Sequence, residues 1–375
     1  FKNIRNMNIL HIIPSLKIGG AERLVVDICN ELSNKKNCTV RLITFSDDFD
    51  SIDLRKSYHK HIPSFYRPSI TSNSAINVGN LQKEIDEFNP DIIHSHLWEA
   101  EILLTQVKVH NVIRFSHFHD NMAQLRKISL PNSKIKITDF FERNIFLKSN
   151  SNNFICISND TLSYANKVLP KKNRKNIHLL ENAIQYEKFY SIKNKNIDKI
   201  NLINMGSFVP KKNQKLSVTI LNELINKGYP ANLIFLGDGP NINDIVAYAK
   251  ELKIENFIEF KGNVTDVKPY LEQSNLYLHT AYYEPFGLVI IEAMAAGLPV
   301  VTLDGLGNRD FIEHGDNGYI FKSQDPETFA NCIIDLFNNE KLYLKNQKNG
   351  YTTAKKYDIK EYINKLIEIY RNSLQ

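Results

Sequence analysis

The chain has 375 residues, of which 42% are hydrophobic and 23% charged. This length favours two domains, and the composition excludes a disordered chain, a disulfide-stabilised miniprotein and a collagen-like fibre. The 47 basic residues outnumber the 41 acidic residues by only six. This mild excess does not demand nucleic acid, so we expect no nucleic-acid partner, and an anionic bilayer or a phosphorylated substrate fits it equally.

The cysteines and the apolar stretches predict a reduced, cytoplasmic protein. No CxxC pair and no metal-ligand spacing connects the four cysteines, Cys29, Cys38, Cys156 and Cys332. The sequence opens without the pattern of a signal peptide. The longest apolar stretch, Phe286–Leu303, contains a glutamate, a glycine and a proline, and its pattern predicts a helix and then a strand rather than a membrane span.

In the first half of the chain, short apolar runs alternate with segments of helical spacing, which predicts a parallel sheet with helices on both faces. The predicted strands are Asn8–Ile13, Thr39–Thr44, Asp91–His94, Val112–Ser116, Phe154–Ile157 and Ile177–Leu180. The predicted helices are Ala21–Ser33 and Leu81–Phe88.

The same alternation restarts after a polar, Lys/Asn-rich stretch at Ile184–Asp198, which predicts a boundary between a domain at 1–184 and a second at 198–356. The predicted strands of the second domain are Ile200–Met205, Ala231–Leu236, Ile258–Phe260, Leu276–His279 and Pro299–Thr302. Its predicted helices are Gln214–Asn226, Ile242–Leu252 and Val289–Ala296.

The resulting fold class is α/β, with two doubly wound, Rossmann-like domains that face each other across a cleft. Ligands of such sheets bind beyond the carboxyl ends of the strands. A last amphipathic helix is predicted at Tyr357–Leu374, and we expect the segment 357–375 to pack back on the first domain.

A glycine pair, Gly19 and Gly20, joins the first predicted strand to the first helix. Such a pair lets a ligand approach the backbone, and the helix start behind it favours anions. The pair is equally compatible with a tight turn that binds nothing. Because the GxGxxG fingerprint is absent, a nicotinamide dehydrogenase is a distant alternative.

Two glutamates, Glu284 and Glu292, stand eight positions apart around a predicted helix start. Pro285 is predicted at the first helical position and Gly287 near the turn, so N–H groups around Phe286–Leu288 would face a diphosphate or sugar hydroxyls. Glu292 lies in an otherwise apolar helix, where a carboxylate is costly unless it is paired, and a ribose diol would pair with it. The alternative is a solvated glutamate on the outer face.

Histidines fall at the ends of two predicted strands: His94, His96, His117 and His119. His117 and His119 share strand parity, so both side chains can face the cleft. Metal binding by these histidines is conceivable, but no acidic residue is spaced to complete an open zinc site, so we expect no metal. The alternative is a histidine that only caps a strand end.

The stretch EPFGLVIIEAMAAGLPVV resembles the signature of retaining nucleotide-sugar glycosyltransferases of family four, which have the GT-B fold. The resemblance covers nearly the whole chain. IIPSLKIGGAERLVVDICNEL resembles the first strand and glycine loop of that family, DIIHSH its fourth strand, and LLENAIQYEKF the segment that closes the first domain. GSFVPKKNQ, FLGDGP and FKGNV resemble the start of the donor domain, and GNRDFIEHGDNGYIF its final βα unit.

The resemblance implies a role for each matched residue. Glu292 would bind the donor ribose, Glu284 would touch the donor sugar, and Lys212 would neutralise the diphosphate leaving group. His119, with His117 as the second choice, would hydrogen-bond the donor sugar and stabilise positive charge at the anomeric carbon. The remaining implied substrate contacts are Gly19, Gly20, Gly206, Ser207, Lys211, Asn263, Val264, Pro285, Phe286, Gly287 and Leu288.

Ser207, after Gly206, is a departure from the family, which usually has an arginine there. Serine donates a hydrogen bond but carries no charge, and Lys211, beside Lys212, is the residue that would compensate.

A second basic area is Lys167–Lys175, with Lys134, Lys136, Arg143 and Lys148 before it. It would contact anionic lipid or form a solvated charged face.

The predicted function is retaining transfer of a sugar from a nucleotide-diphosphate donor to a hydroxyl of a saccharide or lipid-linked saccharide. We expect a role in cell-surface polysaccharide or glycolipid synthesis, no cofactor and no metal, and a location in the cytoplasm or at the inner face of the plasma membrane. Acceptor recognition is expected around Asp47–Asn77 and Asn121–Ser151. The alternatives are a nucleotide-sugar binding subunit with weak activity, suggested by Ser207, and a nucleotide-sugar 2-epimerase of GT-B fold.

Overall fold

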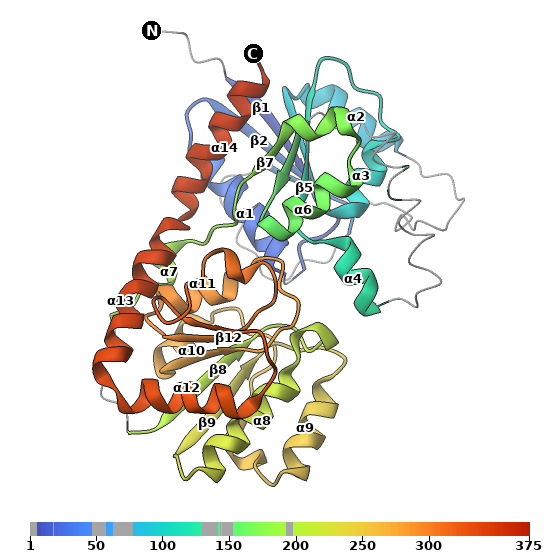
Figure 1. The fold of residues 1–375 in the computed structure, drawn as a ribbon. Helices are drawn as coiled ribbons and strands as arrows, with labels where there is room; N and C mark the ends of the chain where they lie inside the picture. The colour runs from blue at the N-terminus through green and yellow to red at the C-terminus, as the bar shows by residue number, and fades with distance from the viewer. Residues whose placement is uncertain are drawn as a thin grey trace. The chain divides into compact units, whose positions relative to one another are not determined.

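The computed structural model describes residues 6–17, 19–46, 58–62, 78–129, 142, 144, 153–192 and 198–375. The chain divides into two compact units (Figure 1). Unit 1 comprises Phe1–Ala183 and Ile359–Gln375, and unit 2 comprises Ile184–Asp358. In the described part of the chain, no helix combines the length and the apolar character that crossing a bilayer requires.

Unit 1 is built on a seven-stranded sheet in which all the described pairings are parallel. Its strands are β1 (Met7–Ile12), β2 (Cys38–Thr44), β3 (Tyr58–His61), β4 (Ile92–His96), β5 (Ile113–Phe118), β6 (Asn153–Cys156) and β7 (Ile177–Leu179). Their spatial order is β3-β2-β1-β4-β5-β6-β7. The order reverses between β1 and β4, and ligands of open α/β sheets bind at such a switch point.

Different helices cover the two faces of this sheet. The described helices of unit 1 are α1 (Gly20–Ser33), α2 (Gly79–Phe88), α3 (Leu97–Leu104), α4 (Met122–Ser129), α6 (Asn159–Val168), the 3-10 helix η1 (Lys171–Asn176) and α14 (Ile359–Ser373). α1 and α14 pack side by side on the face that contains Ile9 and Phe115 (Figure 1). α2 and α3 pack on the opposite face with Leu10 and Ile12. Because both faces are covered, β1 places apolar residues on both sides, Ile9 on one and Leu10 and Ile12 on the other.

Unit 2 repeats the same arrangement with a six-stranded parallel sheet. Its strands are β8 (Ile200–Met205), β9 (Ala231–Leu236), β10 (Ile258–Phe260), β11 (Leu276–His279), β12 (Val300–Leu303) and β13 (Tyr319–Phe321). The order β10-β9-β8-β11-β12-β13 places its switch point between β8 and β11.

The helices of unit 2 also form two layers. They are α7 (Tyr186–Phe189), α8 (Gln214–Asn226), α9 (Ile242–Glu251), α10 (Lys268–Gln273), α11 (Leu288–Ala295), α12 (Pro326–Asn338) and α13 (Glu340–Lys356), with 3-10 turns η2 (Pro210–Lys212), η3 (Glu255–Phe257) and η4 (Asn308–Asp310). α8, α9 and α12 share one core with the sheet through Leu221, Ile245 and Ile333. α11 packs against α13, where a Cβ on Gly350 would lie 3.6 Å from the Met294 side chain.

The observed elements confirm most of the predicted ones. Elements observed with the predicted bounds are Ile200–Met205, Gln214–Asn226, Ala231–Leu236, Ile258–Phe260 and Leu276–His279. The apolar stretch Phe286–Leu303 contains a helix and a strand, as predicted. The helix near the C-terminus begins at Ile359 rather than Tyr357, because Asp358 pairs with Ile184 in an isolated bridge.

The prediction that Pro285 occupies the first helical position is wrong. α11 begins at Leu288, and Gly287 is its N-cap with φ +106°. This left-handed conformation interrupts helical geometry, so Pro285 lies before the helix. Several elements were not predicted, among them α3, α6, α12, β3 and α13. β3 is short and mostly polar, and α13 has a largely polar sequence.

Candidate functional site

The predicted donor-site residues of unit 2 gather at the switch point between β8 and β11. Gly206 directly follows β8, Lys212 ends η2, and Glu284 follows β11. The side chain of Lys212 runs over Gly206, where an added Cβ would lie 3.5 Å from Lys212 Cε. The three residues thus form one site at the carboxyl edge of the sheet.

Lys212 and Glu284 form a largely buried ion pair, with 2.5 Å between Nζ and Oε2. The Nε2 atom of His279 lies 3.0 Å from the same carboxylate oxygen. Burial alone would raise the pKa of Glu284, but the charge of Lys212 and the hydrogen bond of His279 together hold that pKa well below its usual range. Burial lowers the pKa of His279 and outweighs its bond to Glu284. Glu284 is therefore an anion, ready to face positive charge on a ligand.

Two glycine loops approach each other behind Lys212. A Cβ on Gly237 would lie 2.2 Å from the carbonyl oxygen of Gly206, and both residues have positive φ. No larger residue fits at Gly237 without moving this backbone. The N–H of Gly237 donates to the carbonyl of Gly262, 2.8 Å away. The loops after β8, β9 and β10 are thereby tied together.

The start of α11 lies beside Glu284. Gly287 caps the helix, and Phe286, Gly287 and Leu288 are buried. N–H groups in the first turn of a helix point out along its axis and favour anionic ligands. The backbone of Glu284 is held here as well, because its N–H donates to Gly305 O at 2.8 Å. A helix start and an ordered loop therefore flank the ion pair.

Glu292 lies in the second turn of α11 and is only 1% exposed. The interpretation of Glu292 as a solvated residue on the outer face is therefore wrong. Burial raises the pKa of Tyr277 well above its usual range, and the charges of Glu284 and Glu292 add to that rise. Both carboxylates thus act on one buried tyrosine of β11.

The other predicted residues of unit 2 lie in the loops after β8 and β10. Ser207 is exposed and its carbonyl accepts from the Gln214 side chain at 3.0 Å. Lys211 lies over the ring of Tyr283, 5.4 Å from its centroid, so it turns to a different partner from Lys212. Exposed Asn263 and half-buried Val264 follow Gly262 at the end of β10.

The predicted histidines of unit 1 belong to a buried cluster on the face of the sheet that α1 and α14 cover. His117 and His119 lie at the end of β5, and their rings stack with centroids 4.1 Å apart. Both border a cavity of about 60 Å³ that Trp98 and Met122 also line. His119 Nε2 lies 3.0 Å from His96 Nδ1.

Burial lowers the pKa of every histidine in this cluster. The pKa of His119 falls to about 3. The pKa of His117 lies well below its usual range because of burial and, next, the neighbouring His119. These imidazoles are neutral at physiological pH, so they act through lone pairs and N–H groups.

At the glycine pair of unit 1, the Glu22 side chain covers Gly19. A Cβ added to Gly19 would lie 2.0 Å from Glu22 Oε2, so a larger residue here would require this flexible side chain to move. Gly19 is the N-cap of α1 in an extended conformation, and Gly20 is the first residue of the helix. Burial raises the pKa of Glu22. The Gly19–Gly20 turn thus carries an acidic side chain that the sequence analysis did not consider.

The chain matches two family models that follow one another along the sequence. Residues 18–188 match Glycosyltransferase Family 4, and residues 185–353 match Glycosyl transferases group 1. This chain belongs to glycosyltransferase family 4. The resemblance in the sequence is therefore confirmed.

Curated relatives support the assignment to family 4. N-acetyl-alpha-D-glucosaminyl L-malate synthase of Bacillus anthracis is 32% identical over 167 residues, which cover 44% of this chain and 43% of that protein. Poly(glycerol-phosphate) alpha-glucosyltransferase of Bacillus subtilis is 30% identical over 155 residues, covering 39% of this chain and 23% of that protein. The matched segments thus span less than half of these relatives' own length.

HepE of Anabaena, solved in complex with UDP and glucose, superimposes with a TM-score of 0.79 at 18% identity and covers 97% of this chain and 99% of its own. At this identity the likeness shows the fold. The predicted GT-B class, with two doubly wound Rossmann-like domains, is therefore confirmed.

The family-4 motif residues are divided between the two units. Gly19, Gly20, His117 and His119 belong to unit 1, and all the other predicted site residues belong to unit 2. Sequence reasoning missed His279, which binds Glu284, and His11, which joins the histidine cluster. Strand parity could have placed His11 with these histidines, because β1 pairs with β4 and His11 lies opposite His94. Lys134, Lys136, Arg143, Lys148 and most of both expected acceptor segments lie outside the described residues.

Proposed function

We propose that this protein is a retaining glycosyltransferase that moves a sugar from a nucleotide-diphosphate donor to an acceptor hydroxyl. The observation that carries the proposal is the Lys212–Glu284 ion pair beside the start of α11, with Glu292 buried in the next turn. The site combines a cation and helix N–H groups for a diphosphate with carboxylates for a sugar and a ribose. No metal ion is needed to neutralise the diphosphate in this arrangement.

The reaction then depends on electrostatic stabilisation. Lys212 and the helix N–H groups stabilise the departing diphosphate, while the Glu284 carboxylate stabilises positive charge at the anomeric carbon. The bond to the diphosphate oxygen breaks on the same face on which the acceptor oxygen bonds, so the configuration is retained. The leaving phosphate takes the acceptor's proton.

The expected setting is the synthesis of a cell-surface polysaccharide or glycolipid in the cytoplasm or at the inner face of the plasma membrane. The curated relatives that act on poly(glycerol-phosphate) and related polymers support this setting. An exposed basic turn, with Lys171, Lys172, Arg174 and Lys175 in η1, would contact anionic lipid. Flotation with anionic and neutral vesicles tests this contact, and equal binding to both would argue for a merely solvated face.

A panel of UDP-, GDP- and ADP-sugars tests the donor class. A ligand at 100 times its Kd stabilises the folded state by about 2.7 kcal/mol, which a thermal-shift measurement detects. We expect one nucleotide class to raise the melting temperature and to be hydrolysed or transferred by the purified chain. Absence of a shift with all three classes would contradict the proposal.

A donor-binding subunit with weak activity is the second candidate, and the exposed Ser207 is the observation that favours it. Ser207→Arg restores a charge at this position. If Ser207 limits donor binding, this variant will bind the donor more tightly and turn it over faster. A Ser207→Ala variant is the control, since it removes the hydroxyl without adding a charge.

A further inference from the structure

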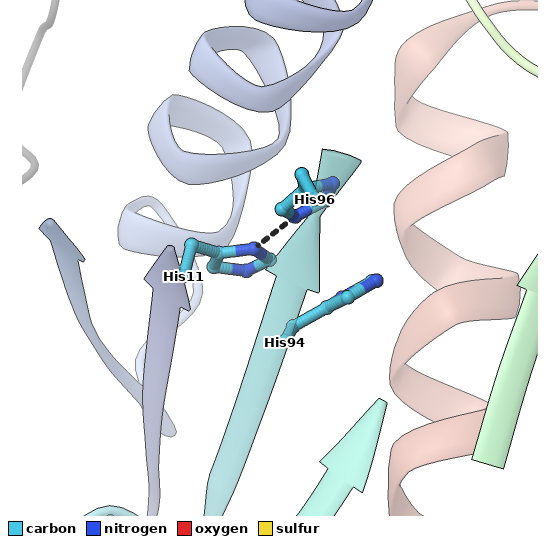
Figure 2. Close-up of side chains that lie close together, drawn as sticks. All are labelled: His11, His94 and His96. Atoms are coloured by element: carbon cyan, nitrogen blue, oxygen red, sulfur yellow. Dashed lines mark hydrogen bonds between the residues drawn. The ribbon is translucent and has the colours of Figure 1, made fainter. Parts of the chain in front are cut away.

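Three histidines meet at the switch point of unit 1, on two neighbouring strands. His11 is on β1, while His94 and His96 are on β4, and Figure 2 shows the rings of His11 and His96 facing each other while the His94 ring extends toward α14. His11 and His94 are register partners across the β1–β4 pair. One ligand nitrogen from each of the three lies within 4.8 Å of the other two. The expectation of no metal was based on four histidines without His11, which β-sheet pairing adds.

The cluster contains more imidazole nitrogens than protein partners for them. All three side chains are fully buried. His11 Nδ1 lies 2.9 Å from His96 Nε2 (Figure 2), but His11 Nε2 and His94 Nε2 have no hydrogen-bond partner among the described residues. A buried polar atom without a partner is costly, so His94 Nε2, whose ring already bonds Tyr370 through Nδ1, is suited to bind a ligand. Neutral imidazole nitrogens with free lone pairs suit a metal ion.

Tyr370 of α14 provides the outer contact that metal-binding histidines usually have. Its hydroxyl lies 2.5 Å from His94 Nδ1, and the His94 ring points toward α14 (Figure 2). When Nδ1–H donates to this hydroxyl, the lone pair of Nε2 is left for a metal. The hydroxyl is not needed for the core packing of Tyr370, since a phenylalanine ring would fill the same space.

We propose that His11, His94 and His96 form a binding site for a zinc-class divalent transition metal. Zinc–nitrogen bonds of 2.0–2.1 Å place the ligand atoms of a tetrahedral site roughly 3.3 Å apart. In the structure the three nitrogens lie within 4.8 Å of one another. Imidazole ligands without oxygen or thiolate select Zn²⁺, Ni²⁺ or Cu²⁺ over Mg²⁺ and Ca²⁺.

Metal binding exchanges contacts without changing the charge of the ligands. The proton shared by His11 Nδ1 and His96 Nε2 moves to the other nitrogen of its own ring, and both lone pairs then bind the ion. The ion would link β1 to β4 beneath α1 and α14, so it would enter as unit 1 folds. It would stabilise the sheet, and it is distinct from the diphosphate site of unit 2.

The test measures metal content in the full chain. The protein is purified from cells grown with added Zn²⁺ and, separately, refolded from urea with Zn²⁺ or Mg²⁺, and the metal per chain is measured by elemental analysis and native mass spectrometry. We expect about one zinc per chain by both routes and no retained magnesium. His11→Gln and His94→Gln should lose the zinc, whereas His178→Gln, a matched control on β7 of the same sheet, should keep it.

Tyr370→Phe keeps the test decisive if the histidine variants fail to fold. It retains the ring in the core and removes only the hydroxyl beside His94, so we expect zinc affinity to fall by about 10-fold or more. A wild-type chain that holds no zinc by either route would overturn the proposal. Zinc retained with unchanged affinity in His11→Gln or His94→Gln would also overturn it, because the ion would then lie elsewhere.

Discussion

The switch points of the two units occupy equivalent places in similar sheets but contain different chemistry. In unit 1, β1 and β4 end in buried, neutral imidazoles, among them His11 and His96. In unit 2, the loops after β8 and β11 bring Lys212 against Glu284. The comparison shows that sheet topology provides the location, whereas the residues at the strand ends decide which ligand is bound.

The difference follows from where the polar groups lie. The histidines belong to the strands themselves and face a covered side of the sheet, where burial suppresses their charge. Lys212 and Glu284 lie past the strand ends, and each provides the opposite charge that the other needs. Anion binding is therefore expected in unit 2 and lone-pair chemistry in unit 1.

The largest expected effect comes from breaking the charged pair. Lys212→Met leaves the buried Glu284 carboxylate without its cation, so unit 2 should lose about 3 kcal/mol of stability. The protein should also lose its donor turnover. Urea unfolding and donor hydrolysis measure the two losses. Lys261→Met is the matched control, since Lys261 pairs with Glu259 at the same 2.5 Å but in an exposed position. Its cost should be much smaller, because solvent screens an exposed ion pair. Equal costs for both variants would contradict the importance of burial.

Glu292→Gln tests the ribose contact with little change in shape. Loss of a charged hydrogen-bond acceptor costs about 1.5–3 kcal/mol, which corresponds to roughly 10- to 150-fold weaker donor binding. Calorimetric titration with the donor found in the panel measures this change. Unchanged donor affinity would mean that the Glu292 carboxylate does not bind the ribose and has only a structural role.

Gly287→Ala tests the backbone at the start of α11. The added Cβ would meet Ile290 Cδ1 at 2.8 Å, and the residue has φ +106°. We expect a loss of about 2 kcal/mol in thermal unfolding. Gly315→Ala is the control, because Gly315 also has positive φ but nothing within 4 Å of the new Cβ. It should cost only about 1 kcal/mol. Equal losses of stability would mean that the contact with Ile290 adds nothing to the cost of Gly287→Ala.

The smallest expected effect is a dependence of stability on pH through Glu284. Its folded-state pKa lies below the ordinary 4.5, so the unfolded chain binds the proton more readily. The stabilisation is fully present above about pH 5 and is lost as the pH falls. Between pH 7 and pH 3.5 this carboxyl should account for about 1 kcal/mol of the loss. Urea unfolding at both pH values should show a smaller loss in Glu284→Gln than in the wild type.

Elements with a strong local pattern were predictable from the sequence. The bounds of α8 and β9 followed from apolar periodicity, and Glu292 stood out as a lone charge in an apolar helix. The contacts of His279 with Glu284 and of His11 with His96 depend on sheet register and loop path, which no local pattern contains. Pro285 was wrongly predicted to begin the helix because Gly287, with its left-handed backbone conformation, moves the helix start to Leu288.

The path of the chain makes unit 2 an insertion within unit 1. Its first and last residues, Ile184 and Asp358, are bridged, and Ile184 N–H donates to Tyr357 O at 2.9 Å. A segment whose two ends are neighbours can be excised or replaced as one cassette, and a short linker in its place can rejoin the flanking chain. Separately expressed copies of unit 2, and exchanges of this unit between relatives, should therefore be cut at these two residues, and α14 must stay with unit 1.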